Sequence, residues 1–436
     1  MKIKFLTLGC KVNQVETESM QRLFELAGHA IVDAIDEADA IVINTCAVTA
    51  VAAQKSRQMI HKAARSGKVI AVVGCYSQSS PNEIDADIVI GTKDRRRIVE
   101  LVERAVGDKI NIVGEVGTTF EELPHLPSKT RAFIKIEDGC DNRCSYCIIP
   151  TLRGTVRSRS LDSLRAECSQ LHSLGFREIV LTGIHLGAYG KDCGLRLIDA
   201  VNAALESGMP SRLRLSSIEA TEVHDELIEL LKNDRRLCRH LHLPLQSGCD
   251  EVLRAMHRPY STKQFAQLIE RLAIEIPNIA ITTDLIVGFP GETNAMFEQS
   301  IEFVESMPFS KLHVFPYSAR PDTPAASMSD QIDPNVKRER AARMIEISNR
   351  KSIEYRRKFL GTSVEVLTET STNGIIDGLT DNYIRVFIAE EVPLGELVRV
   401  EITGLKDDGV SGILPKACRE SPLLELWRCS GGIKNI

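Results

Sequence analysis

The chain has 436 residues, of which 43% are hydrophobic and 26% are charged, and its formal net charge at pH 7 is −5. This length allows two or three domains with their own cores, and the acidic balance argues against a protein that binds nucleic acid through its overall charge. No apolar stretch approaches the length of a membrane span, and residues 1–4 lead directly into an apolar run rather than a signal peptide. We therefore expect a cytoplasmic protein with no membrane partner.

Three cysteines follow three apolar runs in the amino-terminal part of the chain. Cys10 comes after residues 3–8, Cys46 after residues 40–43 and Cys75 after residues 69–73. The runs predict buried parallel strands, and each is followed by a plausible helix, such as residues 16–26. Because the carboxyl ends of parallel strands converge on one crevice, the three thiols could meet there, although a cysteine at a strand end can equally be a small buried apolar residue.

This alternation of strands and helices predicts a doubly wound domain of residues 1–122, and a stretch with two prolines at residues 122–128 predicts a linker. A second alternation predicts a domain of residues 130–360. Its expected strands are residues 132–136, 178–181, 212–216, 241–245, 280–286 and 311–315. Six parallel strands separated by helices predict a partial (β/α)6 barrel, so the fold class is α/β with the chemistry at the carboxyl ends of the strands.

The loop after the first barrel strand holds Cys140, Cys144 and Cys147, a C-x3-C-x2-C run with three thiolates and no fourth. A structural zinc site prefers four protein ligands, whereas an iron-sulfur cubane with one uncovered iron can bind a small molecule there. The spacing resembles that of radical S-adenosylmethionine (SAM) enzymes, in which SAM binds the open iron and is cleaved to a 5′-deoxyadenosyl radical. That resemblance implies that Tyr146 lies beside the adenine of SAM.

A basic stretch precedes the carboxyl-terminal part of the chain. Residues 334–358 contain nine Lys or Arg against three Glu, above a helical rhythm of apolar residues. One face of this helix would therefore pack, and the other would offer cations such as Arg350, Arg356 and Arg357 to phosphates. A solvated helix without a partner is the alternative.

After residue 361 the sequence changes to short alternating runs with turns at Asn373-Gly374 and Asp408-Gly409. This pattern predicts a small all-β barrel of residues 361–428. Small barrels of this kind can hold RNA with aromatic side chains, here Tyr383, although a purely structural Tyr383 is equally compatible with the sequence.

Longer motifs resemble the radical SAM methylthiotransferase family. The matching segments are residues 9–13 (GCKVN), 44–46 (NTC), 74–75 (GC), 140–159, 182–187 (TGIHLG), 216–219 (SSIE), 240–248 (HLHLPLQSG) and 284–292 (DLIVGFPGE). The first segment is similar to the branch that acts on N6-threonylcarbamoyladenosine in transfer RNA (tRNA), and residues 378–383 resemble the RNA-binding TRAM domain of the family. Asp322 stands where the family commonly carries glycine, so we expect no glycine-specific backbone angle there.

The resemblance implies an enzyme with SAM and two 4Fe-4S clusters, one on Cys10, Cys46 and Cys75 and the other on Cys140, Cys144 and Cys147. It would convert N6-threonylcarbamoyladenosine at position 37, next to the anticodon of tRNA, to the 2-methylthio derivative. A radical is required because no side-chain base can deprotonate the C2–H bond of adenine. An electron donor and a sulfur donor must serve the reaction from outside the chain.

The same resemblance suggests roles for further residues. Thr182, Gly183, Glu219 and Gln246 would bind SAM; Arg157 and Arg159 would reach a phosphate or the threonyl carboxylate; Asn13 and Asn44 would orient the amino-terminal cluster. Two alternatives stay open at this point. One is a sibling methylthiotransferase that acts on isopentenyladenosine in tRNA or on a ribosomal-protein aspartate, and the other is a non-enzymatic, zinc-bearing RNA-binding protein.

Overall fold

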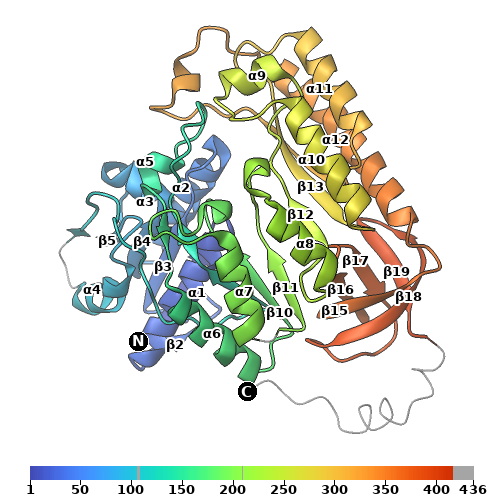
Figure 1. Ribbon diagram of the computed structural model, residues 1–436. Helices are drawn as coiled ribbons and strands as arrows, with labels where there is room; N and C mark the ends of the chain where they lie inside the picture. Colours follow the sequence, from blue (N-terminus) through green and yellow to red (C-terminus); the bar gives the residue numbers. More distant parts are fainter. Residues whose placement is uncertain (106–108, 209, 416–436) are drawn as a thin grey trace.

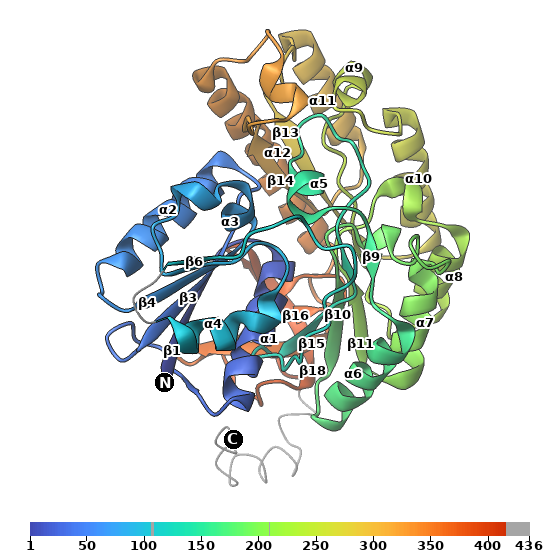
Figure 2. The ribbon, with the colours of Figure 1, turned by 90° about the vertical axis from the view of Figure 1, so that its left-hand side faces the viewer.

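The computed structural model describes residues 1–105, 109–208 and 210–415. Figures 1 and 2 show an amino-terminal α/β unit in blue, an α/β half-barrel in green and yellow, and a small β-barrel in red that lies against the half-barrel. The predicted fold class is therefore confirmed. The predicted end of the last domain, residues 416–428, lies outside the described residues.

The amino-terminal unit is a parallel sheet with the strand order β2-β1-β3-β4-β5-β6. Its strands are β1 (Lys2–Thr7), β2 (Ala30–Ile31), β3 (Ala40–Thr45), β4 (Val69–Gly74), β5 (Ile88–Val89) and β6 (Ile110–Asn111). Its helices are α1 (Lys11–Leu26), α2 (Ala50–Ala64), α3 (Cys75–Ser79) and α4 (Ile98–Arg104). The apolar side chains of α2 and α3 pack on one face of the sheet and those of α1 and α4 on the other, as in a doubly wound fold.

Helix α1 begins at Lys11, five residues before the predicted start at residue 16. Polar residues occupy much of its first turn, and the cap residue Cys10 makes no capping hydrogen bond with its side chain. The usual sequence signals of a helix start are therefore missing there.

The half-barrel has six parallel strands arranged as two three-stranded sheets, β11-β10-β7 and β12-β13-β14. They are β7 (Arg131–Lys135), β10 (Glu178–Thr182), β11 (Arg212–Leu215), β12 (His240–His242), β13 (Ala280–Val287) and β14 (Lys311–Pro316). Isolated bridges from Leu213 to Leu237 and from Ser217 to His242 join the two sheets. Each of the six strands overlaps a strand that the sequence predicted.

Helices cover the outer face of the half-barrel. They are α6 (Leu161–Ser173), α7 (Leu197–Ser207), α8 (Asp225–Asn233), α10 (Thr262–Glu275), α11 (Asn294–Ser306) and α12 (Pro334–Arg357), with the short helices α5 (Ile149–Arg153) and α9 (Asp250–Ala255) in loops. A two-stranded ribbon of β8 (Glu137–Asp138) and β9 (Arg157–Ser158) follows β7. Alternate strand residues such as Leu181, Leu215 and Leu241 face these helices and form the largest core.

One predicted barrel strand is shorter than expected. Residues 241–245 were expected to be extended, but β12 ends at His242. Pro244 has no N–H to donate to a neighbouring strand, and Gln246 adopts a φ of 70°. The chain therefore leaves the sheet early and bends toward the site at the strand ends.

The carboxyl-terminal unit is a closed barrel with the strand order β15-β16-β17-β19-β18. Its strands are β15 (Ser363–Thr372), β16 (Ile375–Thr380), β17 (Arg385–Ile388), β18 (Leu397–Lys406) and β19 (Gly409–Ile413). The predicted turn at Asn373-Gly374 joins β15 to β16 with φ angles of 52° and 77°, as a tight hairpin requires. None of the helices within the described ranges is long and apolar enough to cross a membrane.

Buried arginines attach this β-barrel to the half-barrel. Arg212 donates to the carbonyl of Leu379 at 2.9 Å, and Arg214 donates to the carbonyl of Thr380 at 3.0 Å. Arg214 also pairs with the buried carboxylate of Glu178 at 2.7 Å. The contact is a specific interface, which fixes the small barrel at the amino ends of the half-barrel strands.

Candidate active site

The three amino-terminal cysteines meet at the carboxyl edge of their sheet. Cys10 follows β1 and Cys46 follows β3, on the two sides of the point where the strand order reverses, and Cys75 follows β4. The pKa of Cys75 is raised to about 11, mainly by burial and also by the neighbouring Cys10 and Cys46, while Arg153 acts in the opposite direction. The thiols are therefore close enough to influence one another electrostatically.

Two asparagines and a glycine shape this group of thiols. The Cys10 thiol donates to Asn13 Oδ1 at 3.5 Å, Asn13 Nδ2 donates to the Thr45 carbonyl at 2.9 Å, and Asn44 Nδ2 donates to the Asn13 carbonyl at 2.8 Å. Gly74 has a φ of 106°, and a Cβ there would lie 2.5 Å from Asn44 Oδ1. Glycine before the cysteine is thus required both by the backbone angle and by the space.

The second set of thiols lies in the loop that follows β7 and β8. The pKa of Cys140 is raised to about 12 and that of Cys147 to about 11, mainly by burial and also by the neighbouring thiols of the set. Arg258 Nη1 donates to Cys144 Sγ at 3.3 Å, and His185 Nδ1 lies 3.4 Å from Cys140 Sγ. This loop also lies at the carboxyl end of the half-barrel, as predicted.

The donor chemistry of both sets fits an open iron-sulfur cluster. Each set offers three thiols, and in each set an arginine donates a hydrogen bond to one of the sulfurs. Among the described residues, no group of three His, Cys, Asp or Glu side chains could hold one metal ion. A cubane takes one thiolate on each of three irons, so its ligands need not converge on a single point.

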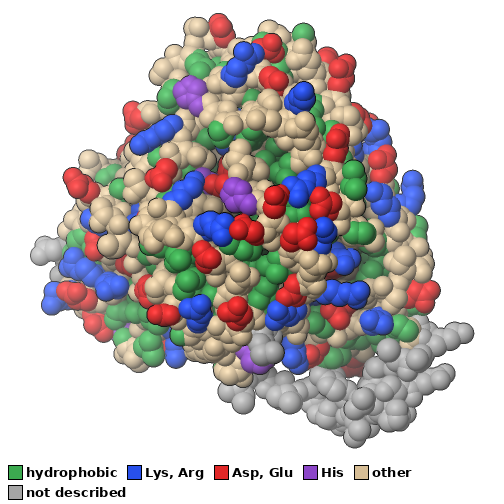
Figure 3. All heavy atoms as spheres, in the orientation of Figure 1, with side chains coloured by type: hydrophobic (Ala, Val, Ile, Leu, Met, Phe, Trp, Pro, Cys, Tyr) green, Lys and Arg blue, Asp and Glu red, His purple; other side chains and the backbone are tan. Residues whose placement is uncertain are grey.

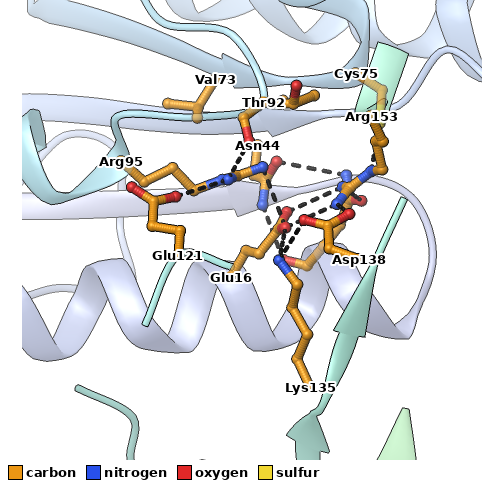
Figure 4. Close-up of polar contacts among 12 residues, drawn as sticks. Glu16, Asn44, Val73, Cys75, Thr92, Arg95, Glu121, Lys135, Asp138 and Arg153 are labelled. Carbon is orange, nitrogen blue, oxygen red and sulfur yellow. Dashed lines mark hydrogen bonds and ion pairs between the residues drawn. The ribbon is translucent and has the colours of Figure 1, made fainter. Parts of the chain in front are cut away.

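Arg153 joins the first set of thiols to the half-barrel. It is fully buried at the end of α5, six residues after Cys147, and its Nε donates to Cys75 Sγ at 3.4 Å. Its other nitrogens donate to Glu16 at 2.9 Å, to Asp138 at 3.0 Å and to Asn13 Oδ1 at 3.1 Å. Figure 4 shows this guanidinium between the amino-terminal sheet and the half-barrel.

A network of buried charges surrounds Arg153. Lys135 Nζ donates to Glu16 at 2.9 Å and to Asp138 at 2.7 Å, and Arg95 lies 3.1 Å from Glu16. Burial alone would raise the pKa of Glu16, but Arg153, Arg95 and Lys135 together lower it to about 2. The carboxylates therefore remain ionised, and the network holds the two units together through charge.

The sequence did not identify Arg153 or Arg258 as site residues. Arg153 is the last residue of the helix Ile149–Arg153, which lies between the cysteine loop and Gly154. A charged side chain at the end of this mostly apolar segment was the one sequence feature that could have indicated a buried role. Arg258 pairs with Glu219 and donates to the Tyr260 hydroxyl at 3.0 Å. No local pattern indicated its contact with Cys144.

The residues expected to bind SAM lie around the second set of thiols. Thr182 ends β10, and the space over Gly183 is narrow because a Cβ there would lie 2.6 Å from Glu137 Oε2. Glu219 carries the ion pair with Arg258, and Tyr146 packs against the small apolar cluster around Cys249. The backbone N–H of Gln246 donates to the Asp284 carbonyl of β13 at 2.9 Å.

Glu137 is a further buried carboxyl group beside this site. Its Oε2 accepts the His185 N–H at 2.6 Å, whereas its Oε1 has no hydrogen-bond partner in the described part of the chain. Burial raises the pKa of Glu137 well above its ordinary value. Burial therefore favours the protonated form of this carboxyl group.

A cavity of about 480 Å³ lies inside the half-barrel, and all three units contribute to its wall. Its lining includes Lys11 from α1, His240, His242 and Asp284 from the half-barrel, and Tyr383 and Arg385 from the β-barrel. His240 and His242 both contact the Thr282 hydroxyl, at 3.1 and 2.9 Å. Lys311 and His313 on β14 are exposed, so the cavity opens to solvent along this edge strand. Its size is that of a typical small-ligand site.

Tyr383 belongs to the wall of this cavity. Its ring stacks on the His240 ring with the two centroids 4.5 Å apart. The guanidinium of Arg214 also lies 4.9 Å from the centroid of the Tyr383 ring. Tyr383 adopts a φ of 66°, an uncommon angle for an aromatic residue. The structure thus gives the ring protein partners rather than presenting it as a free platform for a base.

The two arginines predicted to reach the substrate are engaged elsewhere. Arg157 donates to the carbonyls of Gly117 and Arg153, at 2.9 and 2.6 Å, and lies 3.3 Å from Asp138. Arg159 pairs with Glu167. Neither lines the cavity.

The three arginines predicted to form the basic face of α12 have different surroundings. Arg350 pairs with Glu305, Arg356 is buried and donates to the carbonyls of Asp407 and Gly409, and Arg357 is exposed. Figure 3 shows basic and acidic side chains interspersed over the visible face rather than a patch of one sign. Only part of the predicted set is therefore available to phosphates.

The expectation for Asp322 is wrong. Asp322 adopts a φ of 64°, in the left-handed region that glycine favours. The special backbone angle is retained, and aspartate is among the few other residues that tolerate it.

Comparison with known proteins agrees with this geometry. Residues 134–304 match the Radical SAM superfamily, and residues 2–91 match the uncharacterized protein family UPF0004. The chain is 42% identical to the threonylcarbamoyladenosine tRNA methylthiotransferase MtaB of Bacillus subtilis (strain 168), over 92% of this chain and 93% of that protein. It is 39% identical to the ribosomal protein uS12 methylthiotransferase RimO of Desulforudis audaxviator (strain MP104C), over 92% and 94% of the two chains.

Among solved structures, the radical SAM methyltransferase TsrM from Kitasatospora setae, with cobalamin and a 4Fe-4S cluster bound, has a similar fold. The TM-score is 0.54 at 14% identity, and the match covers 74% of this chain and 77% of that one. A half-barrel with a C-x3-C-x2-C loop after its first strand defines a radical SAM enzyme. With its second set of three thiols and the extent of these matches, the chain belongs to the radical SAM methylthiotransferase family.

Proposed function

We propose that this protein is a tRNA methylthiotransferase that converts N6-threonylcarbamoyladenosine at position 37, next to the anticodon, to its 2-methylthio derivative. The observation that carries the proposal is the contact of Arg153 with Cys75, because this half-barrel residue holds the first three-thiol set against the unit that carries the second set. The similarity to relatives named for this activity supports the choice of substrate.

The six cysteines would hold two 4Fe-4S clusters, with Cys140, Cys144 and Cys147 serving the cluster at which SAM binds. When bound, the clusters and SAM supply one-electron chemistry, a sulfur atom and a methyl group. The contribution of the chain is to bind, to orient and to exclude water.

Particular residues carry this contribution. Asn13, Asn44 and Arg153 fix the loops of the amino-terminal thiols through the hydrogen bonds described above. We propose that SAM is surrounded by Tyr146 from the cysteine loop and by Thr182, Gly183, Glu219 and Gln246, which lie at or after the carboxyl ends of half-barrel strands. The adenine would enter the cavity along β14, where the wall is open.

RNA would be held outside the cavity by α12 and the β-barrel. Arg357 is exposed at the end of α12 and can reach a phosphate, whereas Arg356 serves the interface between the two elements. Contacts of this kind position RNA without reading its sequence. Because its proposed substrate is tRNA, we infer a cytoplasmic location. An electron donor and a sulfur donor would be its further partners.

The test is anaerobic assay of the reconstituted protein on anticodon stem-loop RNAs that differ only at position 37. We expect 2-methylthio product from RNA with threonylcarbamoyladenosine, and much less from RNA with isopentenyladenosine or unmodified adenosine, as measured by mass spectrometry of nucleosides. A ribosomal-protein peptide with its aspartate serves as a further substrate. Preferential thiomethylation of isopentenyladenosine or of the peptide would assign the chain to a sibling activity.

A further inference from the structure

Lys11 is a cation that reaches the cavity without a charged partner. It is the first residue of α1, directly after Cys10, and it lines the cavity together with Tyr383 and His240. Its Nζ lies 5.9 Å from the centroid of the Phe133 ring. The described residues offer it neither a hydrogen bond nor an ion pair, although it is half-buried.

The other cations of the cavity differ from Lys11. Arg385 pairs with Asp377 at 2.7 Å and with Asp408 at 3.4 Å, and Arg356 is occupied by backbone carbonyls. Lys311 is exposed on β14, where water can solvate it. Lys11 is therefore the cavity-lining cation that is both partly withdrawn from water and lacking a counter-ion within the described ranges.

The acidic groups of the cavity do not neutralise Lys11. Asp284 lies 3.2 Å from His242 Nε2, and Asp408 pairs with Arg385. Burial lowers the pKa of His240 well below its ordinary value, so this imidazole is neutral and adds no positive charge. A bound anion would compensate the cost of holding the Lys11 ammonium in a partly dry site.

We propose that Lys11 is the specificity-determining residue that binds the carboxylate of the threonylcarbamoyl group. This inference rests on the proposed function and adds the residue that recognises the substituent. An isopentenyl group carries no charge, so the same lysine would disfavour it by leaving a buried cation unpaired. The assignment replaces Arg157 and Arg159, whose guanidinium groups are engaged away from the cavity.

Direct binding tests the proposal without depending on turnover. Three anticodon stem-loop RNAs would be titrated with the reconstituted protein by fluorescence anisotropy: one with threonylcarbamoyladenosine, one with its carboxylate masked as a methyl ester, and one with adenosine. We expect the native protein to prefer the free carboxylate. Lys11→Met should weaken binding of that RNA by about 10- to 100-fold and bring the three affinities together.

Two further variants separate the possible outcomes. Lys11→Arg keeps a cation and should retain the preference, whereas Lys311→Met removes the exposed lysine of the same cavity and should leave the preference in place. Retention of the preference in Lys11→Met, or its loss in Lys311→Met, would overturn the assignment. Circular dichroism and iron content confirm that each variant is folded and loaded.

The same experiment distinguishes failure of the inference from failure of the proposed function. If the native protein thiomethylates the threonylcarbamoyladenosine RNA selectively but Lys11→Met keeps its binding preference, only the role of Lys11 is wrong. If the native protein shows no preference for that RNA in either binding or turnover, the substrate assignment itself fails, and the role of Lys11 fails with it.

Discussion

Arg153 Nε lies 3.4 Å from Cys75 Sγ, so a residue of the half-barrel touches a thiol of the amino-terminal sheet. The same guanidinium donates to Glu16 and Asp138, one from each unit. The relative position of the two thiol sets is therefore fixed by one fully buried residue rather than by the linker alone.

The first prediction concerns this residue. Arg153→Met should lower the free energy of unfolding by about 3–5 kcal/mol, because it leaves Glu16 and Asp138 as buried carboxylates with fewer cations. Chemical denaturation measures the change, and the exposed Arg357→Met is the matched control. An unchanged midpoint for Arg153→Met would show that the network contributes little.

A second prediction is that the protein binds about eight irons, since two three-thiol sets each fit one 4Fe-4S cluster. Replacing Cys140, Cys144 and Cys147 by Ala should remove about half of the iron, and so should the same change at Cys10, Cys46 and Cys75. Iron and acid-labile sulfide analysis after anaerobic reconstitution provides the measurement. If either triple variant lost all of its iron, or none, two independent sites would not exist.

The two clusters should also have separable duties. The triple Ala variant at Cys10, Cys46 and Cys75 should form no methylthio product, yet it should still cleave SAM to 5′-deoxyadenosine at the other cluster. Chromatography of both products from one reaction checks this. Loss of SAM cleavage in a variant that retains the half-barrel cluster would contradict the division.

A pH dependence follows from His125 in the linker. Its ring contacts Glu167 at 2.7 Å and Glu18 at 3.1 Å, so it joins the half-barrel to α1. Burial lowers the pKa of His125, but the hydrogen bonds and charges of Glu167 and Glu18 raise it to about 9, above its ordinary value of 6.5. The protonated ring should therefore make its full contribution to the free energy of unfolding below pH 6.5. This contribution should disappear as the pH rises through 9 and the ring loses its proton.

The size of this effect is at most about 3 kcal/mol, from the difference between the two pKa values. Denaturant unfolding at pH 6, 8 and 10 measures the free energy of unfolding of both proteins. The native protein should be more stable than His125→Gln at pH 6, and this difference should shrink as the pH rises. A difference between the two proteins that is constant with pH would mean that His125 is not charged in the folded state.

The last prediction separates two neighbouring arginines of α12. Arg357→Met should weaken tRNA binding and reduce the slope of log affinity against log salt by roughly 0.7–0.9, the value for one phosphate contact. Arg356→Met should instead lower stability, because its donors to Asp407 and Gly409 hold the β-barrel on α12. The opposite pattern would mean that Arg356 reaches RNA.

Local patterns were sufficient to predict most of the fold. The apolar runs before Cys10, Cys46 and Cys75 are true parallel strands, and the order of the strands then brings the thiols together. The spacing of apolar residues and the turn residues depend on each segment alone, so they located the six half-barrel strands and some of the strands of the other two units. The early end of β12 was missed because a run of alternating leucines outweighed Pro244.

The contacts between units could not be predicted in this way. Arg153 and Glu16 are separated by 137 positions in the chain, and Arg258 and Cys144 by 114. Arg157 and Arg159 were assigned to the substrate because a free guanidinium suits an oxyanion, but the fold gives them carboxylate and carbonyl partners. Sequence indicates which groups are able to bind, and only the packing decides which of them are still free.

Tyr383 contacts both His240 and Arg214, so the β-barrel contributes to the cavity as well as to its own core. The ring comes from the last unit of the chain, whereas most of the cavity wall is made by the two units before it. The wall of the cavity is therefore complete only when the β-barrel has folded onto the half-barrel. A fragment that ends at α12 would lack Tyr383 and Arg385 and would leave the cavity open on that side as well as along β14.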